Sequence, residues 1–158
     1  MTDGDRDGKR YLSWRDVEAL VYQLVEQLPD DYDHLLVVTR GGMIPAALVS
    51  QLIDLRDILV AAVMFYSGPD DRLKEPLFLQ FPEDPLITGK RVLVVDDVWD
   101  SGGTAVALLE RLRRAGADPD LAVLHYKPKR SHFPDHRPDF FVEETDDWII
   151  YPWQPKGD

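Results

Sequence analysis

The chain has 158 residues, a net charge of -11 and 44% hydrophobic residues, which fits one folded domain and excludes a disordered chain. The absence of cysteine excludes disulfides and thiolate metal sites, and because the first residues do not form a signal peptide we expect a cytoplasmic protein. No apolar run reaches the roughly 20 residues of a membrane helix, so no integral membrane association is expected, and the acidic surface disfavours nucleic acid.

The N-terminal third predicts two helices around one strand. The first nine residues are polar, and we expect no regular structure there. Apolar residues then recur on one helical face from Trp14, with Ser13 as the expected N-cap and Pro29 closing the helix. Residues 35–39 form a short apolar run typical of a buried strand, and a second helix is predicted over about 45–53, with a proline in its first turn.

The middle of the chain contains one strand-like run and one broken segment. Residues 58–66 are apolar and rich in β-forming side chains, which predicts a strand. Residues 67–90 contain repeated prolines and charges. They predict a long loop that leaves the core, with a short hairpin around residues 77–81.

The last part of the chain predicts three more strands and one helix. The strands are expected at residues 91–95, 121–126 and 140–142, and the helix at about 104–115. Strands that alternate with helices indicate an α/β fold, in which a mostly parallel, twisted sheet is flanked by helices. We expect a single domain that covers residues 1–158.

The most informative segment is Val92-Leu-Val-Val-Asp-Asp-Val-Trp-Asp-Ser-Gly-Gly-Thr104. A buried strand brings Asp96 and Asp97 to its carboxyl end, where open α/β sheets bind ligands. Two adjacent carboxylates repel each other, so their partners should be hydroxyls or a cation. The residues that follow, Ser101, Gly102, Gly103 and Thr104, lead into a helix whose N-terminal N–H groups favour an anion. The segment therefore predicts a sugar-phosphate site, although an acidic turn followed by a helix cap is the structural alternative.

This order of residues resembles the signature that binds 5-phosphoribosyl 1-diphosphate (PRPP) in type I phosphoribosyltransferases. Neither a dinucleotide fingerprint nor a Walker A loop is present. Further blocks resemble the bacterial xanthine-guanine phosphoribosyltransferases in order and spacing, at residues 11–14, 38–45, 126–128 and 148–153. The resemblance implies the type I fold with a small base-binding hood at about 128–153 and a flexible catalytic loop at about 67–89. Within that loop, Arg72 lies where the family carries an arginine for pyrophosphate.

The resemblance implies a role for each matching position of the signature. Asp96 and Asp97 would bind the ribose hydroxyls, with the cofactor Mg²⁺ nearby. Asp100 would lie close to purine N7 as a proton acceptor. The loop from Ser101 to Thr104 would hold the 5′-phosphate of PRPP.

The flanking blocks imply contacts to pyrophosphate and to the base. Arg40 and Gly41 match the pyrophosphate loop, in which the family has an unusual cis peptide. Lys127 would donate to purine O6, Trp148 would stack on the base, and the Ile149 backbone would read its other edge. Without the resemblance, Arg40 could be a strand-end charge, Lys127 an edge-strand lysine with an exposed ammonium, and Trp148 a core residue.

A pair of histidines, His132 and His136, imitates the spacing of metal ligands. The proline between them makes a helix improbable there, so a surface loop is the better interpretation.

The function that the resemblance implies is transfer of the phosphoribosyl group from PRPP to a 6-oxopurine (guanine, xanthine or hypoxanthine) in purine salvage. A PRPP-binding regulatory protein and a phosphoribosyltransferase for another base are the alternatives. Lys127 and Trp148 favour a 6-oxopurine. A homo-oligomer, a dimer or a tetramer, is expected, although the sequence does not distinguish the two.

Overall fold

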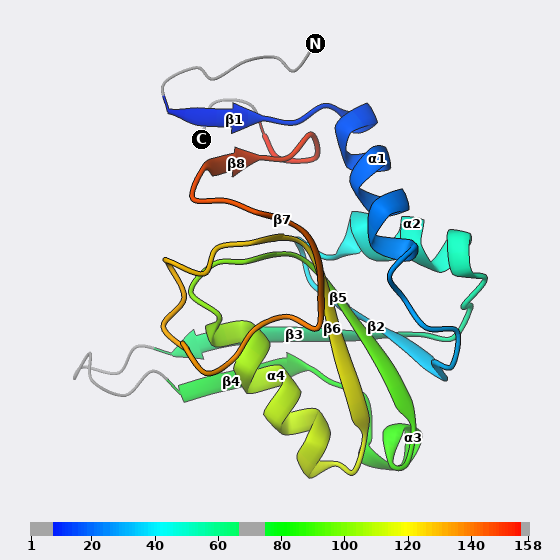
Figure 1. Cartoon of the computed structure of the whole chain (residues 1–158). Helices are drawn as coiled ribbons and strands as arrows, with labels where there is room; N and C mark the ends of the chain where they lie inside the picture. Colours follow the sequence, from blue (N-terminus) through cyan, green and yellow to red (C-terminus); the bar gives the residue numbers. More distant parts are fainter. Residues whose placement is uncertain (1–7, 67–74, 156–158) are drawn as a thin grey trace.

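A computed structural model describes residues 8–66 and 75–155 of the chain (Figure 1). The helices within these ranges are α1 (Trp14–Val25), α2 (Met43–Ile53), α3 (Asp84–Ile87) and α4 (Gly103–Arg114). The strands are β1 (Lys9–Tyr11), β2 (His34–Val38), β3 (Ile58–Tyr66), β4 (Glu75–Gln80), β5 (Arg91–Trp99), β6 (Asp118–Tyr126), β7 (Phe140–Glu144) and β8 (Trp148–Ile150). In the part of the chain that the structure describes, no helix is long and apolar enough to cross a membrane.

The main sheet has six strands in the order β4-β3-β2-β5-β6-β7. All neighbouring pairs are parallel except β3 with β4, which confirms the predicted mostly parallel sheet. The chain continues from β2 to β3 on one side and from β5 to β6 on the other, so the strand order reverses between β2 and β5. In open α/β sheets, ligands bind at the carboxyl ends of the strands that flank such a point.

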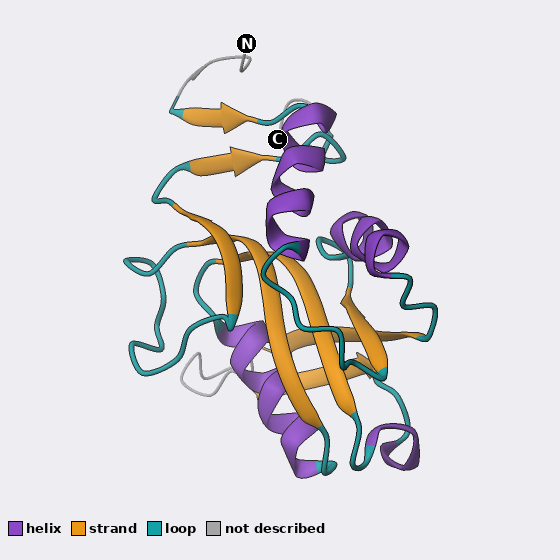
Figure 2. Cartoon of the chain, turned by 45° about the vertical axis from the view of Figure 1, so that its right-hand side comes forward, coloured by secondary structure: helices purple, strands orange, loops and turns teal. Residues whose placement is uncertain are grey.

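Helices cover both faces of the main sheet, and the sheet lies between α4 and the pair α1 and α2 (Figure 2). Side chains alternate between the two faces of a strand. In β2, Leu35 and Val37 pack with residues of α1 and α2, whereas Leu36 and Val38 pack with residues of α4. Because both faces are buried, the central strands are apolar along most of their length.

Helix α1 begins as predicted and ends earlier. Ser13 accepts a hydrogen bond from the Asp16 backbone N–H, and the Asp16 side chain accepts one from the Ser13 backbone, which completes a capping box. The regular helix stops at Val25 and not next to Pro29. Gln27 and Leu28 continue the chain with tighter bonds to the residue three positions back, such as the one from Leu28 N–H to the Val25 carbonyl (3.1 Å).

The prediction for residues 67–90 differs from the structure over its second half. Strand β4 pairs with β3 at the edge of the main sheet, and α3 returns the chain to the core, where Ile87 is fully buried. The prolines do not oppose this arrangement, because Pro76 lies in an edge strand and Pro85 in the first turn of a helix. Residues 67–74, which include Arg72, lie outside the described residues.

A second, two-stranded sheet consists of β1 and β8, which pair in parallel from Lys9 with Trp148 to Tyr11 with Ile150. It stands apart from the main sheet at the top of Figure 1. The expectation of no regular structure up to Lys9 is therefore wrong at its last residue. The two three-residue strands are too short for a periodic signal, and they come from opposite ends of the chain. From here on, the hood means this two-stranded sheet together with residues 151–155, which overlaps only the C-terminal end of the segment at about 128–153 that the resemblance implied.

Candidate active site

Two loops at the carboxyl ends of β2 and β5 form the base of the site. Val37 of β2 pairs with Val95 of β5, so the residues that follow in each strand emerge side by side. After β2 the chain turns through Arg40 and Gly41, and a cis peptide bond joins Thr39 to Arg40, in the loop where the resemblance implied one. The reversal of strand order thus brings two separate sequence motifs to one place.

Gly41 lies so close to the Asp97 side chain that any larger residue at position 41 would have to displace the Asp97 carboxylate. A Cβ atom added to Gly41 would come within 2.5 Å of Asp97 Oδ2. The requirement for glycine therefore has a steric cause within the protein, independent of any bound ligand.

We predict that Gly41→Ala displaces the Asp97 carboxylate and weakens PRPP binding by about tenfold or more, because one charge-assisted hydrogen bond contributes about 1.5–3 kcal/mol. Titration calorimetry with PRPP and Mg²⁺ would measure the change. Gly8→Ala is a suitable control, because a Cβ there meets nothing within 4 Å and its φ of +72° makes this variant a test of backbone strain without a clash. Equal PRPP affinity for wild type and Gly41→Ala would contradict the prediction.

Asp96 and Asp97 are adjacent carboxylates without a cationic partner. Asp96 Oδ1 accepts a hydrogen bond from the Asp97 N–H (2.8 Å), and Asp97 Oδ1 accepts one from the Val98 N–H (2.7 Å). Burial raises the pKa of Asp96 well above its ordinary value, and repulsion from Asp97 raises it further. Burial also raises the pKa of Asp97. Among the described residues neither carboxylate forms an ion pair with a lysine or arginine, so a cation or hydroxyl groups would stabilise the pair.

The described residues contain no group of three or more potential metal ligands, and this includes the surroundings of His132 and His136. Two carboxylates can still hold a Mg²⁺ ion, because this ion usually keeps several waters and takes ligands from a phosphorylated substrate. The donor set of Asp96 and Asp97 therefore fits a magnesium ion shared with a substrate better than a closed protein site.

A second cluster combines a carboxylate, a buried ammonium and an exposed indole. Asp100 Oδ2 lies 3.7 Å from Lys127 Nζ, and Asp100 Oδ1 accepts a hydrogen bond from Arg130 Nε (2.7 Å). The Lys127 ammonium lies over the Trp148 ring, 5.8 Å from its centroid. Only 6% of the Lys127 side chain is exposed, whereas Trp148 is 54% exposed and is not the core residue that its type alone suggests. An open aromatic face beside a buried donor suits a flat, polar ring.

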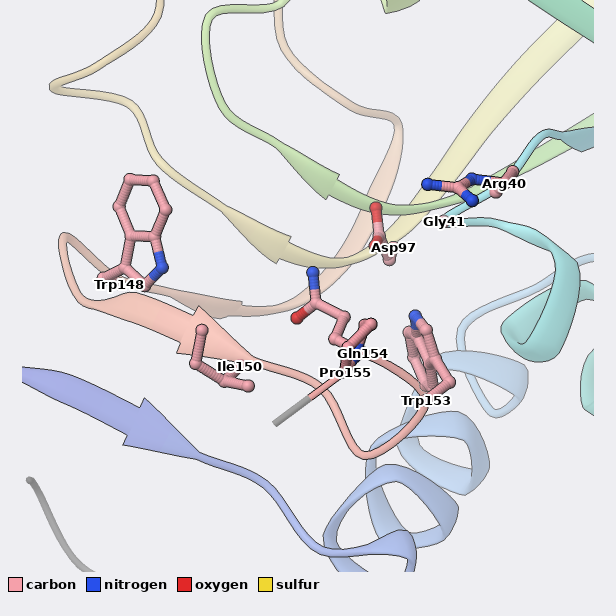
Figure 3. Close-up of a pocket in the computed structure, with 8 residues that line it drawn as sticks. All are labelled: Arg40, Gly41, Asp97, Trp148, Ile150, Trp153, Gln154 and Pro155. Atoms are coloured by element: carbon pink, nitrogen blue, oxygen red, sulfur yellow. The ribbon is translucent and has the colours of Figure 1, made fainter. Parts of the chain in front are cut away.

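A cavity of about 160 Å³ connects this cluster to the first one. It is lined by Asp97, Val98, Asp100, Lys127, Trp148, Ile149, Tyr151 and Gln154. A larger cavity of about 720 Å³ adjoins it and is lined by Arg40, Gly41, Asp97, Trp148, Ile150, Trp153, Gln154 and Pro155 (Figure 3). Figure 3 shows Asp97 beside Arg40 and Gly41, with the hood residues facing them. The shared lining residues make one continuous site between the hood and the main sheet.

The loop from Ser101 to Thr104 opens α4 without a side-chain cap. Gly102 has a φ of +88°, and a Cβ atom there would lie 2.5 Å from Trp99 Nε1. The glycine is therefore also required by the packing of Trp99, a reason that the sequence motif did not reveal. The Gly103 N–H makes one long contact, to Ser101 Oγ (3.5 Å), and among the described residues the other N–H groups at this helix start have no side-chain acceptor, so they can bind an anion.

A third cavity, of about 580 Å³, adjoins this loop and is lined by Asp100, Ser101, Lys129, Arg130, Ser131 and His132. Asp100 lines both this cavity and the one beneath Trp148, which connects the loop to the rest of the site. Four of the predicted site residues, Asp96, Gly102, Gly103 and Thr104, line none of the three cavities.

Tyr151 links the hood to Asp97, and the sequence motifs did not indicate this contact. Its hydroxyl donates to the Asp97 carbonyl (3.3 Å) and lies 2.7 Å from Nδ1 of the buried His125. Burial lowers the pKa of His125 to about 4, so the imidazole is neutral at neutral pH. Gln154, which lines two of the cavities, was also missed because a lone glutamine carries no motif.

A family model described as "Phosphoribosyl transferase domain" matches residues 9–158. The xanthine-guanine phosphoribosyltransferase of Roseobacter denitrificans is 32% identical over 90% of this chain and 84% of that protein. The enzyme of the same name from Idiomarina loihiensis is 33% identical over 90% of this chain and 85% of its own length.

Solved structures of similar proteins point to the same family. A purine phosphoribosyltransferase from Pyrococcus horikoshii has a TM-score of 0.82 and 34% identity, over 94% of this chain and 95% of that chain. A protein from Neisseria gonorrhoeae with bound ppGpp has a TM-score of 0.81 and 28% identity, over 98% of this chain and 93% of that chain. Because the family model covers nearly the whole chain, and the relatives match it over most of their length, this protein belongs to the phosphoribosyltransferase family.

Proposed function

We propose that this protein transfers the 5-phosphoribosyl group from PRPP to N9 of a 6-oxopurine and releases pyrophosphate, as a purine salvage enzyme. The observation that carries the proposal is the continuous site that joins the Arg40–Gly41 turn, Asp97 and the cluster of Asp100, Lys127 and Trp148. Relatives named xanthine-guanine phosphoribosyltransferase, matched over most of their length, support the choice of base.

The PRPP end of the site lies on the main sheet in this proposal. Asp96 and Asp97 hold the ribose hydroxyls and a Mg²⁺ ion, which when bound neutralises negative charge on the diphosphate. The N–H groups from Ser101 to Thr104 bind the 5′-phosphate at the start of α4. Arg40 and the Gly41 N–H stabilise the charge that develops on the departing pyrophosphate. The segment at about 67–89 closes over the site and excludes water, which would otherwise attack the reacting carbon.

The base lies between the hood and the carboxyl ends of β5 and β6. Trp148 stacks on one face of the purine, Lys127 donates to O6, and the Ile149 backbone contacts the opposite edge. Asp100 accepts the N7 proton while N9 bonds to the ribose carbon and the bond from that carbon to pyrophosphate breaks. A positioned general base of this kind contributes about 10²–10⁴-fold to the rate.

A PRPP-binding regulatory protein is the alternative from another functional class. Such a protein would need a surface for its nucleic acid partner, and the net charge of -11 opposes that contact.

We also propose that the protein is a homo-oligomer, a dimer or a tetramer. Exposed apolar side chains on α2, Met43 and Leu52, are compatible with a subunit contact. A cytoplasmic location stays a prediction of the sequence.

The experiment that tests the proposed function follows nucleotide and pyrophosphate formation from PRPP, Mg²⁺ and each of guanine, xanthine and hypoxanthine. Equal amounts of the two products are expected with the wild-type protein, and Asp100→Asn should slow the reaction by about 10²-fold or more. Absence of nucleotide with all three 6-oxopurines would contradict the proposal.

A further inference from the structure

Residues 130–132, in the connection that follows β6, contact residues 99–101, at the carboxyl end of β5, at three points. These are an ion pair from Arg130 Nε to Asp100 Oδ1 (2.7 Å), a hydrogen bond from Trp99 Nε1 to Ser131 Oγ (3.1 Å) and one from the His132 N–H to the Ser101 carbonyl (2.9 Å). The turn itself is held by bonds from the Arg130 and Ser131 N–H groups to the Lys127 carbonyl. These contacts fix the backbone of Arg130 against the start of the loop from Ser101 to Thr104.

The Arg130 side chain has donors left for a second partner. Its contact to Asp100 uses only Nε, and the side chain is half-exposed. Within the described ranges, Asp100 is the one carboxylate that pairs with Arg130, so its terminal nitrogens keep their N–H groups free. Arg130 and Ser101 line the same cavity of about 580 Å³. A guanidinium can donate to two acceptors at once because its five N–H groups point in fixed, different directions.

We propose that Arg130 bridges Asp100 and the 5′-phosphate of PRPP, and so positions Asp100 for the base. This inference rests on the proposed function of the same site. The terminal nitrogens of Arg130 bind the phosphate held by the Ser101 loop, while Nε holds Asp100 Oδ1. Asp100 then keeps Oδ2 toward Lys127 and the cavity beneath Trp148. Arg130 is therefore a phosphate-binding residue and a positioning residue for Asp100.

The test compares Arg130→Ala, Arg130→Lys and a control, Arg137→Ala. Arg137 lies in the same connection between β6 and β7 but packs on the Phe141 ring, 5.3 Å away, so its loss should change the kinetic constants less than twofold. Arg130→Ala should raise the KM for PRPP about tenfold and lower kcat about tenfold, because it removes two charge-assisted contacts. Arg130→Lys should restore most of the KM but not kcat, since an ammonium is a single point charge.

Two further measurements separate the two roles of Arg130. Ribose 5-phosphate, titrated calorimetrically without metal, should bind Arg130→Ala about tenfold more weakly than wild type, and an unchanged Kd would overturn the phosphate contact. In an Asp100→Asn background, Arg130→Ala should lower kcat no further. A kcat loss as large as in the wild-type background would overturn the positioning role.

Failure of the proposed function can be distinguished from failure of the inference about Arg130. If the wild-type protein formed no nucleotide from any base, the catalytic role would be overturned with it, while the ribose 5-phosphate titration would still decide the phosphate contact.

Discussion

Replacing Asp96 and Asp97 together by asparagine is expected to abolish PRPP binding and at the same time to stabilise the free protein. Charge-assisted hydrogen bonds contribute about 1.5–3 kcal/mol each, so the loss of both carboxylates should weaken PRPP binding at least about 100-fold. Stability should increase because two adjacent, half-buried carboxylates without cationic partners repel each other. Asparagine keeps the side-chain oxygen that accepts from the Asp97 or Val98 N–H.

The pH dependence of this stabilisation follows from the raised pKa values. The folded protein holds protons on Asp96 and Asp97 more tightly than the unfolded chain, whose carboxyls titrate near pH 3.9. The unfolded state therefore loses protons first, and the free energy of unfolding falls as pH rises from about 4 through the raised folded-state values. The free energy of unfolding of the asparagine variant does not fall in this way. Its gain in stability over wild type should therefore be small at pH 4 and largest at neutral pH.

Thermal unfolding at pH 4 and pH 7.5, together with PRPP calorimetry, would check both effects. An advantage on the order of 2 kcal/mol corresponds to about 4–8 °C in Tm for a domain of this size. Asp100→Asn is the matched control for stability. It removes a carboxylate just after the same strand, but one paired with Arg130 and Lys127, and should not raise the Tm. Unchanged PRPP affinity would refute the ribose and metal assignment, and a lower Tm at pH 7.5 would refute the electrostatic argument.

The second large effect concerns discrimination between bases. The Lys127 ammonium is buried and can only donate, so it pairs with a carbonyl at purine position 6 and leaves the adenine amino group facing another donor. Mismatches of this kind cost up to about 10⁴-fold in kcat/KM. Lys127→Met keeps the apolar stem and removes the charge. It should lower kcat/KM for guanine by about 10³-fold and leave the low rate with adenine nearly unchanged.

Steady-state rates with guanine and adenine would measure this loss of preference. Lys90→Ala removes an exposed lysine just before β5, at the opposite end of that strand from the site, and should not alter the ratio. PRPP affinity should change less than the base preference, because Lys127 lines the smaller cavity with Asp100 and does not line the larger cavity that contains Arg40 and Gly41. A guanine-to-adenine ratio equal to that of wild type would show that Lys127 does not read O6.

The parts of the fold that the sequence predicted depend on local patterns. The apolar run before Asp96 predicted β5 because a strand buried on both faces needs such a run. Ser13 predicted the start of α1 because a cap is formed by residues three positions apart. The resemblance implied that Arg40 and Asp97 belong to one site, and the pairing of β2 with β5 brings the two residues together. The comparisons confirm the family that these motifs predicted.

The parts that the sequence did not predict depend on contacts between distant segments. The pairing of Lys9 with Trp148 leaves no trace in strands of three residues. Pro76 and Pro85 were interpreted as breaks, yet each occupies a position where a missing N–H costs little. The contact of Arg130 with Asp100 joins the ends of two neighbouring strands through side chains that no motif names. Such contacts are defined by packing in three dimensions.

The most direct test of the central claim is the rate of pyrophosphate release with PRPP, Mg²⁺ and each of guanine, xanthine, hypoxanthine, adenine and uracil. The site predicts turnover with at least one 6-oxopurine, with one nucleoside monophosphate formed per pyrophosphate. Adenine should react more slowly by about 10³-fold or more, because the buried Lys127 ammonium would face a donor. Adenine turnover as fast as that of guanine, or PRPP binding without turnover of any base, would contradict the account.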